Sequence, residues 1–160
     1  MRFNKTIRNF FLVLFSALII SACATAKKGA VDPLKNDVYT GTETVEYLAN
    51  GVPDRVFFAT NKFNLTTAAR DTLRKQATWL RKNKDITVTI EGHADERGTR
   101  EYNLALGERR ANAAKDYLMT YGVSGKRLSV ISYGKERPVN PASSPLAWSQ
   151  NRRSVTVKAN

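Results

Sequence analysis

The chain has 160 residues, 26 Lys and Arg against 14 Asp and Glu, a formal net charge of +12, and an apolar fraction of 42%. This size and apolar content fit one folded domain and argue against a disordered chain. A single cysteine, Cys23, excludes an internal disulfide, and a single histidine, His93, argues against a zinc site and leaves no cofactor expected. The excess of basic over acidic residues is compatible with binding to nucleic acid, to an anionic membrane or to a polymer of the cell wall. Because the charges are scattered, a solvated surface explains most of them and no nucleic-acid tail is expected.

The first 22 residues are predicted to be a signal peptide. Three basic residues, Arg2, Lys5 and Arg8, precede the apolar run Phe10–Ile20, which is shorter than the about 20 residues that a membrane span needs. The run leads into Ser21-Ala22-Cys23, which resembles the bacterial lipoprotein signal, in which the cysteine becomes the acylated first residue. Ala24 after it implies, by the same resemblance, sorting to the outer membrane. The alternative is ordinary cleavage beside a chance cysteine.

A flexible tether is expected between the cysteine and the folded domain. The segment Ala24–Asn50 is polar and keeps no helix or strand period for long. We therefore expect three regions: a signal peptide at 1–22, an acylated N-terminus and tether at 23–50, and one domain at 51–160.

The domain alternates between strand and helix patterns. Apolar residues at three- and four-residue spacing indicate helices, and alternating β-branched residues indicate strands. The predicted elements in chain order are strand Arg55–Phe58, helix Thr66–Lys82, strand Ile86–Glu91, loop Gly92–Thr99, helix Thr99–Tyr121, strand Leu128–Tyr133, loop Gly134–Pro145, a helical turn at Leu146–Gln150 and strand Ser154–Lys158. This order predicts an α/β sandwich with helices packed on one sheet.

The second helix has polar residues on the face expected to contact the sheet. Asn103 and Arg110 lie two turns apart on the same stripe as Leu106. A buried guanidinium is costly unless it is paired. Asp95 supplies a carboxylate just after strand Ile86–Glu91, where ligands commonly bind. Two interpretations remain open: Asp95 and Arg110 bind a ligand that has both an ammonium and a carboxylate, or they form a structural salt bridge.

Two long segments resemble OmpA-like peptidoglycan-binding domains. They are GHADERGTREYNLALGERRANAAKDYL at Gly92–Leu118 and YGKERPVNPASSPLAWSQNRRSVTV at Tyr133–Val157. The first contains the variant typical of peptidoglycan-associated lipoproteins. The resemblance implies an OmpA-like β-α-β-α-β-β sandwich on a mixed four-stranded sheet. It also implies a noncatalytic domain that binds the meso-diaminopimelate residue of peptidoglycan.

The resemblance assigns site residues position by position. It implies that Asp95 meets the diaminopimelate ammonium and Arg110 a diaminopimelate carboxylate, while Asn103 and Leu106 line the pocket. Asn61 stands where related proteins frequently have an aspartate; the asparagine keeps an acceptor and drops the charge, so no ionic role is expected there.

The resulting hypothesis is a protein that tethers the outer membrane to the wall. The resemblance implies a part in the Tol–Pal envelope system with TolB as a partner, and hence in envelope integrity and cell division. The alternatives are an enzyme of wall metabolism, for which neither a nucleophile nor a separated acid pair is found, and another periplasmic basic binding domain. A metal at His93, Asp95 and Glu96 is a weak signal. Strand alternation predicts that Arg152 and Arg153 point to opposite sides, one structural and one exposed.

Overall fold

A four-stranded mixed sheet forms the centre of the domain. The computed structural model describes residues 34–35 and 37–159, so the predicted signal peptide and Cys23 lie outside the described residues. The sheet has the order β5-β8-β6-β7, in which β6 and β7 are parallel and β8 is antiparallel to both of its neighbours. The strands are β5 at Arg55–Phe57, β6 at Val88–His93, β7 at Leu128–Gly134 and β8 at Arg153–Lys158. The predicted mixed four-stranded sheet is confirmed.

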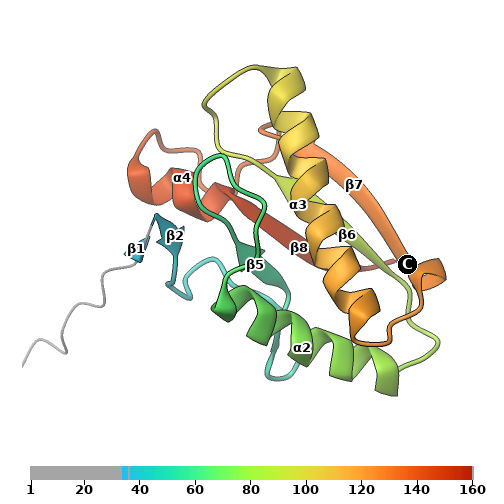
Figure 1. Cartoon of the computed structure of the whole chain (residues 1–160). Helices are drawn as coiled ribbons and strands as arrows, with labels where there is room; N and C mark the ends of the chain where they lie inside the picture. Colours follow the sequence, from blue (N-terminus) through green and yellow to red (C-terminus); the bar gives the residue numbers. More distant parts are fainter. Residues whose placement is uncertain (1–33, 36, 160) are drawn as a thin grey trace, which may run out of the picture. The chain divides into compact units, whose positions relative to one another are not determined.

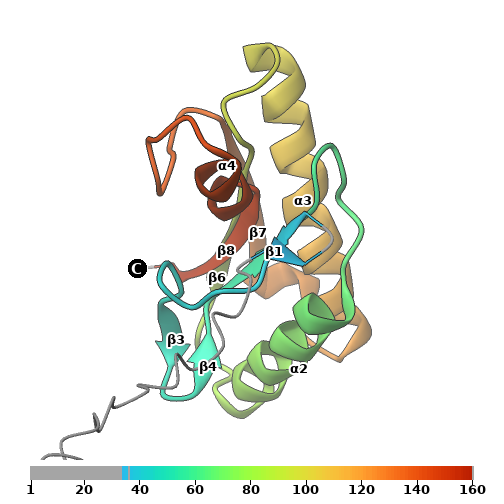
Figure 2. The same cartoon turned by 90° about the vertical axis from the view of Figure 1, so that its left-hand side faces the viewer.

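Two long helices cover one face of this sheet. They are α2 at Thr67–Lys82 and α3 at Arg100–Thr120, and the short helix α4 at Pro145–Asn151 lies on the other side (Figures 1 and 2). A short 3₁₀ helix, η1 at Gly125–Arg127, leads into β7. In the part of the chain described, no helix combines the length and apolarity needed to cross a membrane.

Helix boundaries follow the expected capping residues. The hydroxyl of Thr66 accepts from the Ala69 N–H at the start of α2, and the hydroxyl of Thr99 accepts from the Tyr102 N–H at the start of α3. After α3, Gly122 has a φ of 82°, the left-handed conformation that ends many helices. Local sequence therefore fixes both ends of the element that contains Asn103, Leu106 and Arg110.

The main core lies between the sheet and the two long helices. Alternate strand residues such as Val88 and Ile90 meet the buried stripes of α2 and α3. Helix α3 and strand β6 are in close backbone contact at two glycines, since a Cβ on Gly92 would overlap the main-chain carbonyl of Gly107. This contact between backbones holds α3 against the strand whose end leads into Asp95.

Residues before position 51 contribute to the fold. Strand β1 (Leu34–Lys35) pairs with β2 (Val38–Tyr39), and β3 (Tyr47–Ala49) pairs with β4 (Val52–Pro53). Tyr39 and Leu48 are buried, and the Tyr39 ring packs edge-on against Phe57 with centroids 4.8 Å apart. The predicted tether extends to Asn50, whereas the described part of this stretch, from Leu34 onward, forms short strands. These strands are two or three residues long, too short to show a strand period, so no local pattern indicated the packing of Tyr39 on Phe57.

Candidate functional site

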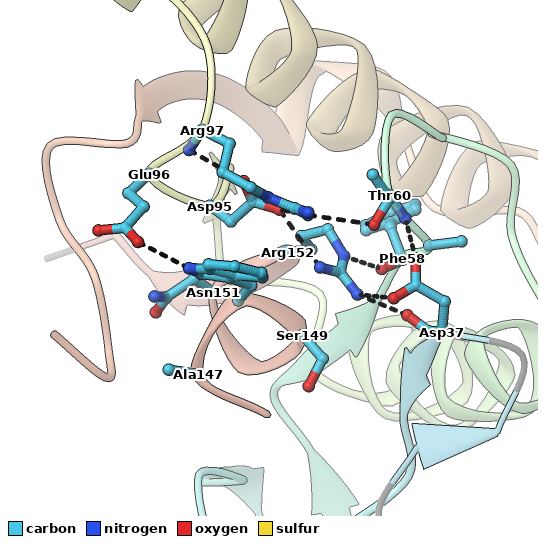
Figure 3. Close-up of polar contacts among 12 residues, drawn as sticks. Asp37, Phe58, Thr60, Asp95, Glu96, Arg97, Ala147, Ser149, Asn151 and Arg152 are labelled. Atoms are coloured by element: carbon cyan, nitrogen blue, oxygen red, sulfur yellow. Dashed lines mark hydrogen bonds and ion pairs between the residues drawn. The ribbon is translucent and has the colours of Figure 1, made fainter. Parts of the chain in front are cut away.

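The predicted site residues gather where β5 and β6 end. The loop that follows β5 and the loop that follows β6 face each other beside α3 and the end of α4, and Figure 3 shows their polar side chains converging. Asp95 and Arg97 come from the second loop, and Arg152 comes from the junction of α4 and β8. Side chains from well-separated parts of the sequence therefore form one cluster.

Arg110 is fully buried and bonded to backbone carbonyls. Its Nε donates to the oxygen of Lys62 at 2.9 Å, its Nη1 to that of His93 at 2.7 Å, and its Nη2 to that of Ala59 at 3.1 Å. Arg110 thus fastens the loop after β5 to the end of β6. The guanidinium has five N–H donors, and these bonds use three of them.

The salt bridge between Asp95 and Arg110, one of the two sequence interpretations, is not formed. No carboxylate among the described residues lies within ion-pair distance of Arg110. Burial, together with the nearby Arg152 charge, lowers the pKa of Arg110 to about 10, while Asp95 only partly offsets this effect. Arg110 is therefore a buried cation whose positive charge is not balanced by a direct contact.

Asp95 is bound by two other arginines. Arg97 donates to its carboxylate from the backbone N–H and Nε at 3.1 Å each and from Nη2 at 2.7 Å, and Arg152 donates from Nη1 at 3.2 Å. Burial raises the pKa of Asp95, but the hydrogen bonds from Arg97 and Arg152 outweigh burial and hold this pKa below its usual value. Asp95 is consequently an ionised carboxylate, and the pattern is unsuited to a general acid.

Arg97 covers Asp95 on the solvent side. Its side chain is 41% exposed, its guanidinium lies 4.3 Å from the ring centroid of Trp148, and its Nη2 donates to the Thr60 hydroxyl at 3.2 Å. The Trp148 indole in turn donates to Glu96 at 2.7 Å, as the dashed line in Figure 3 marks. Arg97 therefore connects the loop after β6 with the loop after β5 and lies between Asp95 and solvent.

Arg152 is a central residue of the cluster that sequence reasoning left unassigned. It is buried and donates to Phe58 O at 3.0 Å, to Asp95, and to both the main-chain oxygen and the carboxylate of Asp37 at 2.6 and 2.8 Å. Asp37 has a φ of 63° and also accepts from the Thr60 N–H at 2.8 Å. The paired arginines after α4 were a signal for a charged site, but alternation alone could not indicate the partners.

The expectation that one of Arg152 and Arg153 is exposed is wrong, since both are buried. Arg152 lies at the end of α4, before β8 begins, so strand alternation does not govern it. Each of the two guanidinium groups is held by backbone carbonyls instead.

The remaining predicted residues lie in or beside the cluster. Asn103 is buried and donates to the carbonyl of Arg97 at 2.9 Å, which supports the loop that contains Asp95. Leu106 is buried one turn before Arg110 on α3. Asn61 is exposed and has a φ of 55°, a conformation that asparagine tolerates better than most residues. In residues 34–35 and 37–159, no three His, Cys, Asp or Glu side chains are grouped to hold a metal.

Comparison with known proteins identifies the family to which the chain belongs. A model of the OmpA family matches residues 57–152. The chain is 46% identical over 149 residues to a peptidoglycan-associated lipoprotein of Mesorhizobium japonicum, covering 91% of this chain and 89% of that protein. It is 47% identical over 150 residues to a protein of the same name from Rhizobium meliloti, covering 91% and 85%.

Solved structures agree with this assignment. The peptidoglycan-associated lipoprotein from Burkholderia pseudomallei is 35% identical with a TM-score of 0.65 over 66% of this chain and 90% of that one. The C-terminal domain of Helicobacter pylori MotB, 22% identical over 67% and 84% of the two chains with a TM-score of 0.62, shares the fold. The relatives are named for an association and not for a reaction, which confirms the prediction that the chain is not an enzyme. The chain belongs to the OmpA family and, within it, to the peptidoglycan-associated lipoproteins.

Proposed function

We propose that this protein binds peptidoglycan noncovalently through the meso-diaminopimelate residue of its stem peptides. The observation that carries the proposal is the charge state of Arg110. A buried guanidinium with unused donors and no ion-pair partner among the described residues is stabilised by an incoming carboxylate, which Arg can bind through two parallel hydrogen bonds. The names of the relatives support the polymer, and the resemblance described above supports the residue.

Asp95 supplies the complementary charge in this proposal. Its carboxylate already binds two cations, and one of them, the guanidinium of Arg97, is partly exposed. A ligand ammonium can take the place of that guanidinium once the Arg97 side chain turns outward from Trp148. Arg152 stays in place behind Asp95 and keeps the carboxylate ionised. The ligand ammonium thus replaces an interaction already made instead of creating a new buried charge.

Diaminopimelate fits these two requirements better than the other charged groups of a stem peptide. Its side chain ends in an ammonium and a carboxylate on one carbon, so both charges reach the protein together. Arg110 and Asp95 approach the site from α3 and from the loop after β6, and their charges are opposite and unpaired with each other. Asn103 and Leu106 support this arrangement from within α3, and Asn61 lies on the facing loop between Thr60 and Lys62.

The proposed cellular role joins this site to a lipid anchor. Acylation of Cys23 would hold the chain in the outer membrane with its domain in the periplasm, so that binding to the wall links the two layers. The family resemblance supports TolB as a partner and a place in the Tol–Pal system, with effects on envelope integrity and cell division. The lowered pKa of Asp95 does not suit the general acid that a wall hydrolase would need.

A pair of peptides tests the ligand. Titration calorimetry of the full-length protein in neutral detergent compares a stem peptide that contains diaminopimelate with one that contains lysine, which keeps the ammonium and lacks the carboxylate. We expect the lysine peptide to bind at least about thirtyfold more weakly, because it leaves Arg110 without its partner. Equal affinities would overturn the role of the carboxylate.

A pair of protein variants tests the site. Asp95→Asn keeps the side-chain shape and removes the charge, and we expect it to lose sedimentation with purified sacculi. Asp71→Asn is the matched control, because Asp71 pairs with Arg74 on the exposed surface of α2. Full sedimentation of Asp95→Asn would show that the wall is bound elsewhere.

A further inference from the structure

A cavity lies on the face of the sheet that α2 and α3 leave open. Its volume is about 650 Å³, within the range of small-molecule sites. Strand alternation puts Glu91 and His93 of β6 on this face, opposite to the core residue Ile90. The cavity is lined by residues of β5, β6 and β8, by Glu46 and the first residues of β3, and by the segment Arg137–Val139.

Arg153 is the unbalanced charge of this cavity. It is only 6% exposed, and its Nε has no hydrogen-bond partner. Its other nitrogens make long contacts to main-chain oxygens: Nη1 to Asn151 at 3.4 Å and Nη2 to Arg137 at 3.2 Å. Among the residues that the structure describes, no carboxylate forms an ion pair with Arg153. A buried cation in this state is costly without an anion.

The charged groups around Arg153 do not neutralise it. Arg55 is neutralised by Asp54, which accepts from its Nε and Nη2 at 2.8 and 2.7 Å. Arg137 stacks on the Tyr133 ring at 3.7 Å, where its guanidinium edge stays free to donate. Burial and the Arg55 charge lower the pKa of Arg153 to about 10, because Glu91 and Asp54 compensate only in part.

We propose that this cavity is a second binding site, which takes a single carboxylate attached to an apolar group. The carboxylate would accept from Arg153 Nε and from the Arg137 guanidinium, while the apolar group would lie against the exposed parts of Tyr47, Val139 and Val157. The lining has one more basic than acidic side chain, which suits a monoanion better than a phosphate dianion. A branched-chain acid and the C-terminal residue of a peptide both present this chemistry.

The second site is separate from the one proposed for diaminopimelate and does not depend on it. His93 marks the boundary, because its carbonyl accepts from Arg110 while its ring lines the open-face cavity. The two arginines thus approach the same residue from opposite faces of the sheet. A carboxylate bound at Arg153 therefore leaves the contacts of Asp95 and Arg110 unchanged.

Nuclear magnetic resonance of the full-length, ¹⁵N-labelled protein in neutral detergent tests the proposal. The probes are N-acetylvaline and its uncharged match, N-acetylvalinamide, followed by an acetylated tripeptide that ends in a free valine. The Nε–H signal of Arg153 is identified by its loss in Arg153→Lys. We expect N-acetylvaline to shift this signal in a saturable manner and the amide to leave it in place. Tighter binding of the tripeptide than of N-acetylvaline would identify a peptide terminus as the source, and weaker binding would identify a free acid.

Variants then separate this site from the first. In Arg153→Lys, which lacks an Nε donor, the probe should bind at least about tenfold more weakly, as expected for one lost charged hydrogen bond. Arg74→Lys, on the exposed surface of α2, should bind it as wild type, and sacculus binding should be unchanged in both variants. A shift at Arg110 without one at Arg153, or no saturable shift in the wild-type protein, would overturn the proposal even if Arg153→Lys failed to fold.

Discussion

Replacement of Arg110 by lysine should destabilise the domain as well as weaken ligand binding. Lysine keeps the positive charge but ends in one nitrogen, so it can replace at most one of the bonds to Lys62, His93 and Ala59. Each bond from a charged donor contributes about 1.5–3 kcal/mol, so the loss of two costs about 3–6 kcal/mol. A domain with a total stability of about 5–15 kcal/mol remains folded at low temperature in most of that range.

The assay is thermal melting of the full-length protein followed by circular dichroism. At about 4 °C per kcal/mol for a domain of this size, Arg110→Lys should melt at least about 12 °C below wild type. Glu108→Gln, on the exposed side of the same helix, should melt as wild type. A melting temperature within about 2 °C of wild type would refute the reasoning that the carbonyl bonds fix the loop after β5.

Binding measured below the melting point separates the two roles of Arg110. The diaminopimelate peptide should bind Arg110→Lys at least about thirtyfold more weakly than wild type, because lysine cannot form the bidentate hydrogen bonds to the carboxylate. A variant that melts early and still binds with unchanged affinity would show that Arg110 only holds the backbone, and the proposed carboxylate contact would then be wrong.

Three further predictions concern other parts of the chain. Cys23→Ser should abolish fatty-acid labelling and release the protein from the outer-membrane fraction; a mutant that stays there would contradict the lipid anchor. Gly92→Ala should cost at least about 3 kcal/mol in urea unfolding because its Cβ meets the backbone of Gly107, whereas Gly125→Ala meets only the flexible Met119 side chain and should cost less. Burial and the nearby arginines lower the pKa of His93 to about 3 in the folded protein. As the pH falls, the unfolded chain therefore binds a proton at this histidine before the folded protein does, and this favours unfolding. Stability should therefore fall by about 2 kcal/mol from pH 6.5 to 5. His93→Gln should flatten this slope, and an equal slope in that variant would contradict the assignment.

Elements with a strong local pattern were predictable from the sequence. The stripe Leu73, Ala77 and Leu80 and the capping residues Thr66 and Thr99 place α2 and α3 within a residue or two of their observed bounds. The same periodicity identified Arg110 as an anomaly on a buried face, which the structure confirms.

The partners of the site residues were not predictable in the same way. Asp37 and Arg152 are 115 positions apart in the chain, and neither lies in a periodic segment that would indicate their contact. Arg97 falls within the loop motif Gly92–Thr99, but its position over Asp95 depends on the approach of Thr60 and Trp148 from other elements. Burial of a charged side chain can be inferred from periodicity; the identity of its partner requires the tertiary arrangement.

The position of Arg152 also determines how the domain would respond to mechanical load. Its guanidinium bonds to Asp37, near the N-terminal end of the described chain, and to Asp95, the residue proposed to hold the ligand. If the N-terminus were anchored in a membrane and the ligand were part of the wall, a force between them would pass through Asp37, Arg152 and Asp95. The hydrogen-bond ladders of β5, β8, β6 and β7 lie outside this short path. Tension would then strain the contacts of Arg152 before it sheared the sheet.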